Sequence, residues 1–409
     1  KERRRSPPVP PPPPPRAQLQ KEMKILSRWI PRLSASVHRF VSTARPLHTA
    51  SGTPRWRPSA PARRVPPGFH AASSPARLLV SSYAPPANGV EDETGAEEPD
   101  EVIEIFPDSS HRDGSIYGGT DHWKTDYRIS DRNETWLDSM MFSDPTDCIM
   151  RNGTCMSHAS RHMLQFLSLR LAKIPEELGS VELYGYIAAR DNLNPLLNYI
   201  VNFSRDDPII VKQGSLINMT GPKRGIELVG TILIEYDMRI KAAGEHEKED
   251  LQVIDGVSLL DNIDTWDRSP FVFRIDGDCG AIDVGVSRLN FAYQATVEVA
   301  VSQVQSSFGM RISCFTSGLD EEIRLFNGAI VEPRGLRRFV VAVSSDDEME
   351  LKLKIAAGSC IPAEYCCCFE AKQHGHATRE ISTGFALITV KVTWSTLEWP
   401  TRDEETKAV

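Results

Sequence analysis

The chain has 409 residues, and its charge is divided unevenly along the sequence. Residues 1–90 hold sixteen Lys and Arg against two Glu, a net charge of +14, so the remaining residues must carry −22 of the overall −8. A body this acidic disfavours nucleic acid and anionic lipid as partners, because binding to either depends on clustered cations. No apolar run approaches the roughly 20 residues that span a bilayer, so the sequence predicts no membrane span.

The first ninety residues have the composition of a segment that does not fold by itself. They contain eighteen of the 29 prolines, and between Met23 and Val90 there is no Asp or Glu, but Lys24 and nine arginines. An acid-free stretch rich in Arg and Ser is typical of a mitochondrial or plastid transit peptide. We therefore expect a disordered leader, read from Met23 by the organellar import machinery, and a mitochondrial location. A plastid, or the cytoplasm if the leader is an artefact of the gene model, is the alternative.

Three further segments are expected outside the main body. Residues 91–105 are acidic and predict a solvated linker. Residues 106–162 mix turn-forming residues with aromatic ones such as Trp123 and Tyr127, which are costly to leave in water. We therefore expect an irregular arm that packs on the body. Residues 398–409 predict a disordered tail.

The body, residues 163–397, shows apolar residues that recur with a period of two. Residues 232–241, for example, place apolar side chains on one face and charged ones, including Glu235 and Asp237, on the other. A strand with one buried face and one face exposed to solvent is typical of antiparallel sheets. The stretch Leu164–Ile174 alternates in the same way and is interpreted as the first strand. Similar runs lie at 296–301, 349–355 and 386–394, and turn-forming stretches lie at 220–225, 276–280 and 344–348.

No helical segments alternate with these runs. The sequence therefore predicts an all-β fold, an antiparallel β-sandwich of about a dozen strands in two large sheets, preceded by the basic leader and the irregular arm.

Several stretches of irregular composition, in this order, resemble a plant (grass) family, the domain of unknown function 6598. The resemblance covers residues 106–397, and such long consecutive matches are hard to obtain by chance. The stretches are MMFSDPTDC (140–148), FLSLRLAKIP (166–175), VELYGYIAARDNLNPLLNYIVNFSRDDPI (181–209), INMTGPKRGIEL (217–228), FRIDGDCGAIDV (273–284), GLRRFVVAV (335–343) and ITVKVTWSTL (388–397).

The resemblance implies little about chemistry, because the family has no assigned activity. Some relatives carry the domain fused to a ribosome-inactivating N-glycosidase domain, which implies a role in defence or stress. The Glu-Ala-x-x-Arg element of that enzyme is not matched here, since the nearest string, residues 370–374, ends in His374 instead of Arg. Depurination of ribosomal RNA is therefore not carried over.

Two groups of Cys and His residues are candidate metal ligands. The first is Cys148, Cys155, His158 and His162, in which two His four residues apart can share one helical face beside two thiols. Its Cys–Cys spacing is wider than in most zinc sites. The alternatives are buried thiols with surface imidazoles, or a disulfide between Cys148 and Cys155 in an oxidising compartment.

The second group lies near the end of the body and includes Cys360, three consecutive cysteines at 366–368, and two His residues. On a strand only Cys366 and Cys368 point to one face, and a loop of this length can fold back so that His374 and His376 approach them. The alternative is a strand whose cysteines pack as small apolar residues.

Basic residues beside predicted turns are candidate ligands for a phosphate or carboxylate group. The alternative is solvated hairpin ends. Motifs of hydrolases, nucleotide-binding enzymes and metalloproteases are absent from the sequence, and no cofactor is predicted. The basic candidates are Arg205, Lys223, Arg224, Arg337 and Arg338.

These features predict a noncatalytic binding or protein-interaction module, whose ligand is an unknown protein or small molecule. The second hypothesis is a defence-associated enzyme, or a factor resembling ribosome-inactivating proteins, that acts on a carbohydrate or nucleic acid. A deep pocket with several buried ionisable groups would favour this second hypothesis.

Overall fold

The computed structural model describes the chain after the basic leader, with several internal gaps. The predicted leader, most of the predicted linker and the predicted tail lie outside the described residues. Described are residues 103–129, 141–146, 148–152, 154–244, 246–262, 265–357 and 361–397.

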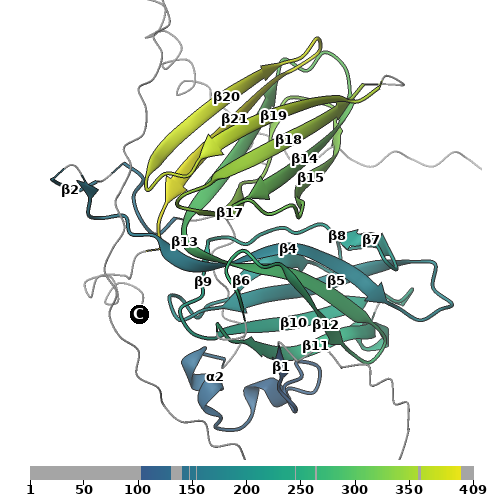
Figure 1. Ribbon diagram of the computed structural model, residues 1–409. Coiled ribbons are helices and arrows are strands. Elements are labelled where there is room, and N and C mark those ends of the chain that lie inside the picture. Colours follow the sequence, from purple (N-terminus) through teal and green to yellow (C-terminus); the bar gives the residue numbers. More distant parts are fainter. Residues whose placement is uncertain are drawn as a thin grey trace, which may run out of the picture. The chain divides into compact units, whose positions relative to one another are not determined.

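In this part of the chain the predicted all-β fold is confirmed (Figure 1). These residues form 21 strands, and the ladders between them are antiparallel. Helical turns are few and short in the described residues: the 3₁₀ turns η1 (Ser115–Tyr117) and η2 (Glu247–Glu249) and the helix α2 (His122–Asp126).

The strands form three larger sheets, which we name after a central strand. The β10 sheet has the order β1-β11-β10-β5-β6, with β7 also paired to β5. Its strands are β1 (Glu104–Ile105), β5 (Ser180–Arg190), β6 (Asn198–Phe203), β7 (Ile209–Lys212), β10 (Ile232–Ile240) and β11 (Leu251–Leu260).

The β13 sheet has the order β20-β21-β13-β4-β8, and further short strands pair with β13 and β4. Its strands are β4 (Arg161–Lys173), β8 (Leu216–Ile217), β9 (Ile226–Glu227), β12 (Phe271–Asp276), β13 (Ala281–Ser302), β16 (Arg334–Gly335), β17 (Phe339–Ser344), β20 (Gly375–Ser382) and β21 (Leu387–Ser395).

The β18 sheet has the order β15-β14-β18-β19, and a separate hairpin of two short strands precedes β4. The strands of the β18 sheet are β14 (Phe308–Thr316), β15 (Ile323–Ile330), β18 (Glu348–Ala356) and β19 (Ala363–Glu370). The hairpin consists of β2 (Met150–Arg151) and β3 (Thr154–Cys155).

Strand β13 pairs with different strands along its length. Its first half pairs with β12 and β4, and its second half pairs with β17 and β21. The register with β4 shifts between Leu289 and Ala292. Within this interval Phe291 has a left-handed backbone, with φ of 49°, which is unfavourable for a bulky residue. This irregularity in β13 lies where the strand changes from one set of partners to the other.

The predicted alternation explains most of the core. In β18, Met349, Leu351, Leu353 and Ile355 are buried, and the residues between them are exposed or half-buried. The turn predicted at 276–280 joins β12 to β13, where Gly277 N–H donates to the carbonyl of Gly280. Apolar side chains of all three larger sheets belong to one continuous core.

The prediction that one face of strand β10 is exposed to solvent is wrong. Glu235 and Asp237 are buried, with 1% and 4% exposed. For Glu235 the reason is the segment 103–129, which packs on this face of the β10 sheet through a second apolar cluster, whereas Asp237 accepts hydrogen bonds from Arg239 and Gln252 of the sheet itself. That cluster contains Ile116, Tyr127, Ile129, Leu233 and Val257.

Candidate metal centre

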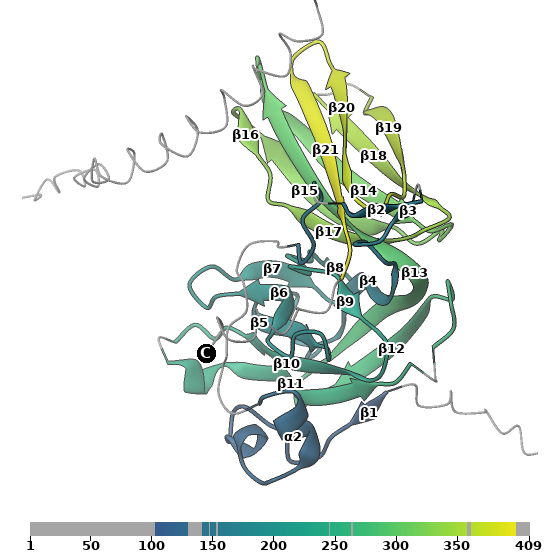
Figure 2. The same ribbon diagram turned by 90° about the vertical axis from the view of Figure 1, so that its left-hand side faces the viewer.

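Residues 141–158 lead into the first long strand without a helix, and hydrogen bonds hold this segment against the body. The hydroxyl of Ser143 accepts the backbone N–H of Thr396 at 2.8 Å, just after β21. The carbonyl of Pro145 accepts the N–H of Gly375 at 2.9 Å, where β20 begins. The segment therefore meets the β19–β20 turn, which carries His374. Figure 2 shows the β2–β3 hairpin beside these strands.

Two thiols and two imidazoles converge at this point. One ligand atom from each of Cys148, Cys155, His158 and His374 lies within 4.8 Å of the others. Zn–S bonds of about 2.3 Å and Zn–N bonds of about 2.0–2.1 Å place tetrahedral ligand atoms about 3.3–3.8 Å apart. The four residues therefore have the composition and the proximity of a Cys₂His₂ zinc site.

His158 shows the orientation expected of a metal ligand. Its side chain is buried, and its Nδ1 lies 3.1 Å from the Cys155 sulfur. Its Nε2 lies 3.0 Å from the backbone carbonyl of Asp144, to which it donates. A hydrogen bond of this kind fixes the imidazole tautomer that leaves the other nitrogen free to bind a metal. The ring of His374 is 4.9 Å from that of His158.

The thiols are not joined to each other. Cys148 and Cys155 are both free, so the disulfide alternative is not formed in this structure. Burial alone would raise the pKa of the Cys155 thiol, but hydrogen bonds with Cys148 and His158 lower it overall. A thiolate is the form of Cys that binds a metal. Two thiolates with two imidazoles in a tetrahedral arrangement favour Zn²⁺ over Ca²⁺ or Mg²⁺, which prefer oxygen.

The structure thus combines the two candidate groups. It joins three residues of the first group to His374 of the second. His162 lies on β4 rather than on a helix, and its ring packs at 5.1 Å from that of Phe291. His376 lies on β20 and is exposed.

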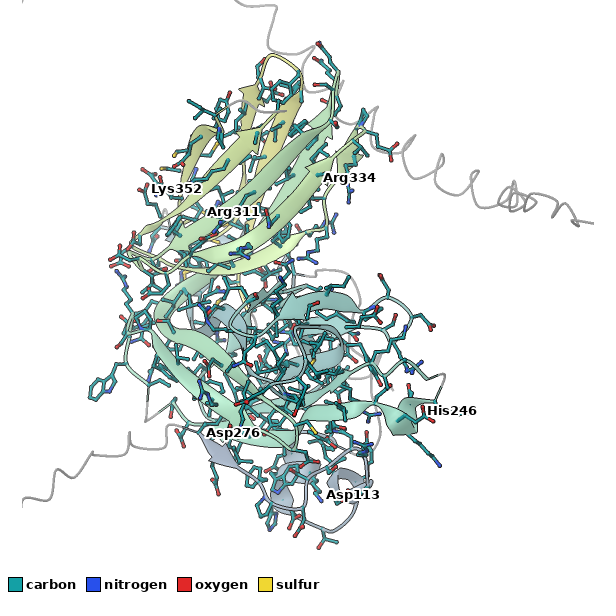
Figure 3. The ribbon with its side chains drawn as sticks, turned by 90° about the vertical axis from the view of Figure 1, so that its right-hand side faces the viewer. Asp113, His246, Asp276, Arg311, Arg334 and Lys352 are labelled. Atoms are coloured by element: carbon teal, nitrogen blue, oxygen red, sulfur yellow. The ribbon has the colours of Figure 1, made fainter. Side chains whose placement is uncertain are left out.

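The remaining cysteines of the second group lie on β19. Cys366 and Cys368 are exposed on one face, opposite Lys352 and Glu350 of β18, and Cys367 is buried on the other face. Figure 3 shows Lys352 on this sheet. Cys360 lies outside the described residues.

Each of the five basic candidates contacts protein groups. Arg205 pairs with Asp250 at 2.7 Å, and Arg338 with Glu298 at 2.9 Å. Lys223 Nζ lies 3.5 Å from the Thr220 carbonyl.

The other two basic candidates differ in burial. Arg224 is 1% exposed and donates to both oxygens of Asp191, at 2.6 and 2.8 Å. Arg337 is exposed; it donates to the Met219 carbonyl and lies 5.2 Å from the Phe339 ring. Ligand binding by these five residues stays a prediction, and the burial of Arg224 makes it the least accessible of them.

Sequence reasoning missed a buried polar cluster beneath the segment 103–129. His111 Nδ1 lies 2.6 Å from Asp255, and its Nε2 lies 3.0 Å from Glu235. Glu235 also accepts from Tyr186 at 2.7 Å and from Arg190 at 2.8 Å. No sequence signal marks this cluster, because Glu235 stands where an alternating strand presents its wet face.

The cluster shifts the titration of its members. Burial lowers the pKa of His111, but hydrogen bonds to Asp255 and Glu235 outweigh it and raise the pKa to about 9. Burial raises the pKa values of Glu235 and Asp255, but hydrogen bonds from His111 outweigh it. Both carboxyl groups therefore have pKa values of about 2. The imidazolium and the carboxylates thus hold each other in the charged form.

No helix in the described residues has the length and apolar character needed to cross a membrane.

Comparisons with solved structures give only distant similarity. Human GIVD cytosolic phospholipase A2, in complex with methyl gamma-linolenyl fluorophosphonate, is 9% identical, with 58% of this chain and 33% of that chain covered and a TM-score of 0.20. This chain thus spans about a third of that phospholipase chain. The calcium-bound pair of C2 domains of extended-synaptotagmin 2 is 9% identical, with 60% of this chain and 99% of that chain covered and a TM-score of 0.21. At such TM-scores the similarity supports no inference about function.

No curated protein matches the chain. A family does match, over residues 163–392, and its description is Domain of unknown function (DUF6598). The matched residues run from strand β4 into strand β21 and include His374, while Cys148, Cys155 and His158 precede them. The chain therefore belongs to the DUF6598 family.

Proposed function

We propose that this chain is a noncatalytic binding module in which a zinc ion fastens residues 141–158 to the β19–β20 turn. The observation that carries the proposal is the convergence of Cys148, Cys155, His158 and His374, which come from two distant parts of the sequence. Four protein ligands complete a tetrahedral zinc site, whereas catalytic zinc sites keep one position for water or substrate. A closed site of this kind supports a structural role.

The local structure also needs such a fastening. Strands β2 and β3 have two residues each and form a sheet of their own in the described part of the chain. A two-stranded hairpin of this length is at best marginally stable in water. A metal bound to Cys148 before the hairpin, Cys155 at its end and His158 just after it closes this loop on itself. The bond to His374 attaches the loop to the body.

Elemental analysis of the purified full chain tests this proposal. We expect close to one equivalent of zinc per chain, and its loss in the variants Cys155→Ser and His374→Ala. The matched controls are Cys366→Ser and His376→Ala, which change an exposed thiol and an exposed imidazole outside the site and should keep the metal. Zinc well below one equivalent in the unchanged protein rejects the proposal.

The second hypothesis, a defence-associated enzyme, is not favoured by a specific observation. It calls for buried ionisable groups that face a pocket. One cleft is lined by aromatic residues, among them Phe106 and Trp123, together with polar ones such as His122, and another lies beside Phe315. The buried groups His111, Glu235 and Asp255 line neither of these two clefts.

The proposal also includes import of the protein into an organelle. It is supported by the acid-free, Arg-rich composition between Met23 and Val90. A fluorescent reporter that carries residues 23–90 should be imported into mitochondria. Import into plastids would replace the predicted mitochondrial location by a plastid one, and a diffuse cytosolic signal would refute the prediction of an import signal.

A further inference from the structure

The two thiols of the metal centre lie on opposite arms of one hairpin. Met150 is paired with Cys155 across the β2–β3 ladder, and Met156 N–H donates to the Ile149 carbonyl at 2.9 Å. This register brings Cys148 and Cys155 toward each other, and their sulfur atoms are within 4.8 Å. A disulfide requires a separation of about 2.05 Å, so one arm of the hairpin has to shift for the two sulfurs to join.

The surroundings of the hairpin allow such a shift. Ile149, Met150 and Met156 are 65%, 60% and 59% exposed, so the hairpin does not contribute these side chains to the core. Cys148 is half-buried and is the more accessible of the two residues, while Cys155 is buried. A change at the hairpin therefore need not disrupt the packed sheets.

We propose that Cys148 and Cys155 form a peroxide-sensitive pair, which releases the zinc ion when the two sulfurs join. The inference rests on the proposed function, because it assigns a form of regulation to that same zinc site. The partner in the reaction is a small peroxide that can reach Cys148.

The chemistry balances with hydrogen peroxide as the oxidant. The Cys148 thiolate attacks one peroxide oxygen, the O–O bond breaks, and a sulfenic acid and hydroxide form. The Cys155 thiolate then attacks the Cys148 sulfur, the S–S bond forms, and a second hydroxide leaves. Two protons from solvent convert both hydroxides to water. The two sulfurs lose two electrons in total, and the peroxide gains them.

Loss of the thiolates removes half of the zinc ligands. Only His158 and His374 remain, and two imidazoles do not complete a tetrahedral site. The metal therefore leaves, and the link between residues 141–158 and the β19–β20 turn is reduced to hydrogen bonds such as Gly375 N–H to the Pro145 carbonyl. A thiol reductant and fresh zinc reverse the change.

The chain contains an internal comparison for this chemistry. Cys366 and Cys368 are more exposed than Cys155, but they are successive outward residues of one strand. Partial burial, with the negative charge of Glu350 close by, raises the pKa of both thiols. Both thiols lie outside the metal centre, so their oxidation by itself releases no zinc, and they serve as the internal control for the pair at the hairpin.

The test uses the zinc-loaded full chain, hydrogen peroxide and a coloured zinc indicator. The zinc content before treatment tests the proposed function, and its release on treatment tests the pair. We expect the release of one zinc per chain together with one disulfide, which peptide mass mapping under nonreducing conditions assigns to Cys148 and Cys155. Reductant with added zinc should restore the metal.

Two results would overturn the inference while leaving the zinc site in place. One is zinc that stays bound while Cys366 and Cys368 are oxidised. The other is zinc release with a disulfide that joins different cysteines. The double variant Cys366→Ser with Cys368→Ser controls for the exposed thiols, and its rate of zinc release should equal that of the unchanged protein.

Discussion

Two segments that precede strand β4 are attached to the β-sheets by different chemistry. Residues 103–129 cover the β10 sheet and are held by an apolar cluster and by the buried charges of His111, Glu235 and Asp255. Residues 141–158 meet the β19–β20 turn, where thiols and imidazoles converge. The first attachment is complete within the protein, whereas in our proposal the second depends on a metal and on the redox state of two sulfurs. On this proposal, the attachment of residues 103–129 needs only protein groups, and the attachment of residues 141–158 also needs a bound metal.

The largest expected effect comes from breaking the buried cluster. Glu235→Ala removes the carboxylate that pairs with Arg190 and with one nitrogen of His111, and it leaves the buried Arg190 without a charged partner. Breaking a buried ion pair in this way costs about 3–5 kcal/mol of stability. Chemical denaturation of the full chain measures the loss. A change below about 1 kcal/mol would mean that the cluster does not secure this segment.

Removal of the metal should have a smaller and more local effect. A ligand present at 100 to 1,000 times its dissociation constant stabilises the folded state by roughly 2.7–4.1 kcal/mol. Chelation of the full chain should therefore lower its stability by this order. Hydrogen exchange should accelerate in residues 141–158 and 371–376 and stay unchanged in residues 103–129. Acceleration in both segments would show that the two attachments are coupled.

The pH dependence separates the two attachments further. His111 has a pKa raised from 6.5 to about 9, so its contribution is complete below pH 6.5 and is lost as the pH rises through about 9. Glu235 and Asp255 have pKa values lowered from 4.5 and 3.8 to about 2. Their contribution is complete above pH 4.5 and is lost as the pH falls through about 2.

The contribution of the buried cluster to folding stability is therefore complete between pH 4.5 and 6.5. Metal binding requires deprotonated ligands and weakens with acid. At about pH 5 we expect residues 141–158 to be less protected from hydrogen exchange than at neutral pH, with each rate compared with the intrinsic exchange rate at that pH, while residues 103–129 stay protected. His111→Gln should abolish the loss of stability between about pH 7 and 9. The same loss in this variant would assign the alkaline transition to another group.

The smallest effect should come from an exposed ion pair. Lys354 and Glu364 lie 3.2 Å apart on the β18 sheet, and both side chains are largely in solvent. Exposed pairs of this kind contribute about 0–1 kcal/mol. Glu364→Ala should therefore shift the unfolding midpoint little, and it serves as the matched control for Glu235→Ala. An equal loss of stability in the two variants would contradict the distinction between buried and exposed charge.

The sheets were predictable because alternation follows from simple burial. Met349, Leu351 and Leu353 enter the core and Lys352 does not, as a strand with one wet face requires. The face of Glu235 could not be predicted, because its burial depends on a segment distant in the sequence. A strand pattern shows which residues share a face but not what covers that face.

The candidate site was predictable in its residue types but not in its membership. Cys148, Cys155 and His158 are close in sequence, and their side chains can bind the same metal. His162 was predicted as the fourth ligand because a spacing of four suits a helix, but the chain is extended from Arg161 onward. In the structure His374 is the fourth residue of the group, because the β19–β20 turn contacts Pro145. This contact joins distant parts of the chain and cannot be predicted from local sequence.

X-ray absorption at the zinc edge of the purified full chain tests the central claim most directly. We predict one zinc per chain with two sulfur neighbours at about 2.3 Å and two nitrogen neighbours at about 2.0–2.1 Å. A shell of oxygen and nitrogen alone, or a chain without zinc, would contradict the assignment of Cys148, Cys155, His158 and His374 as its ligands.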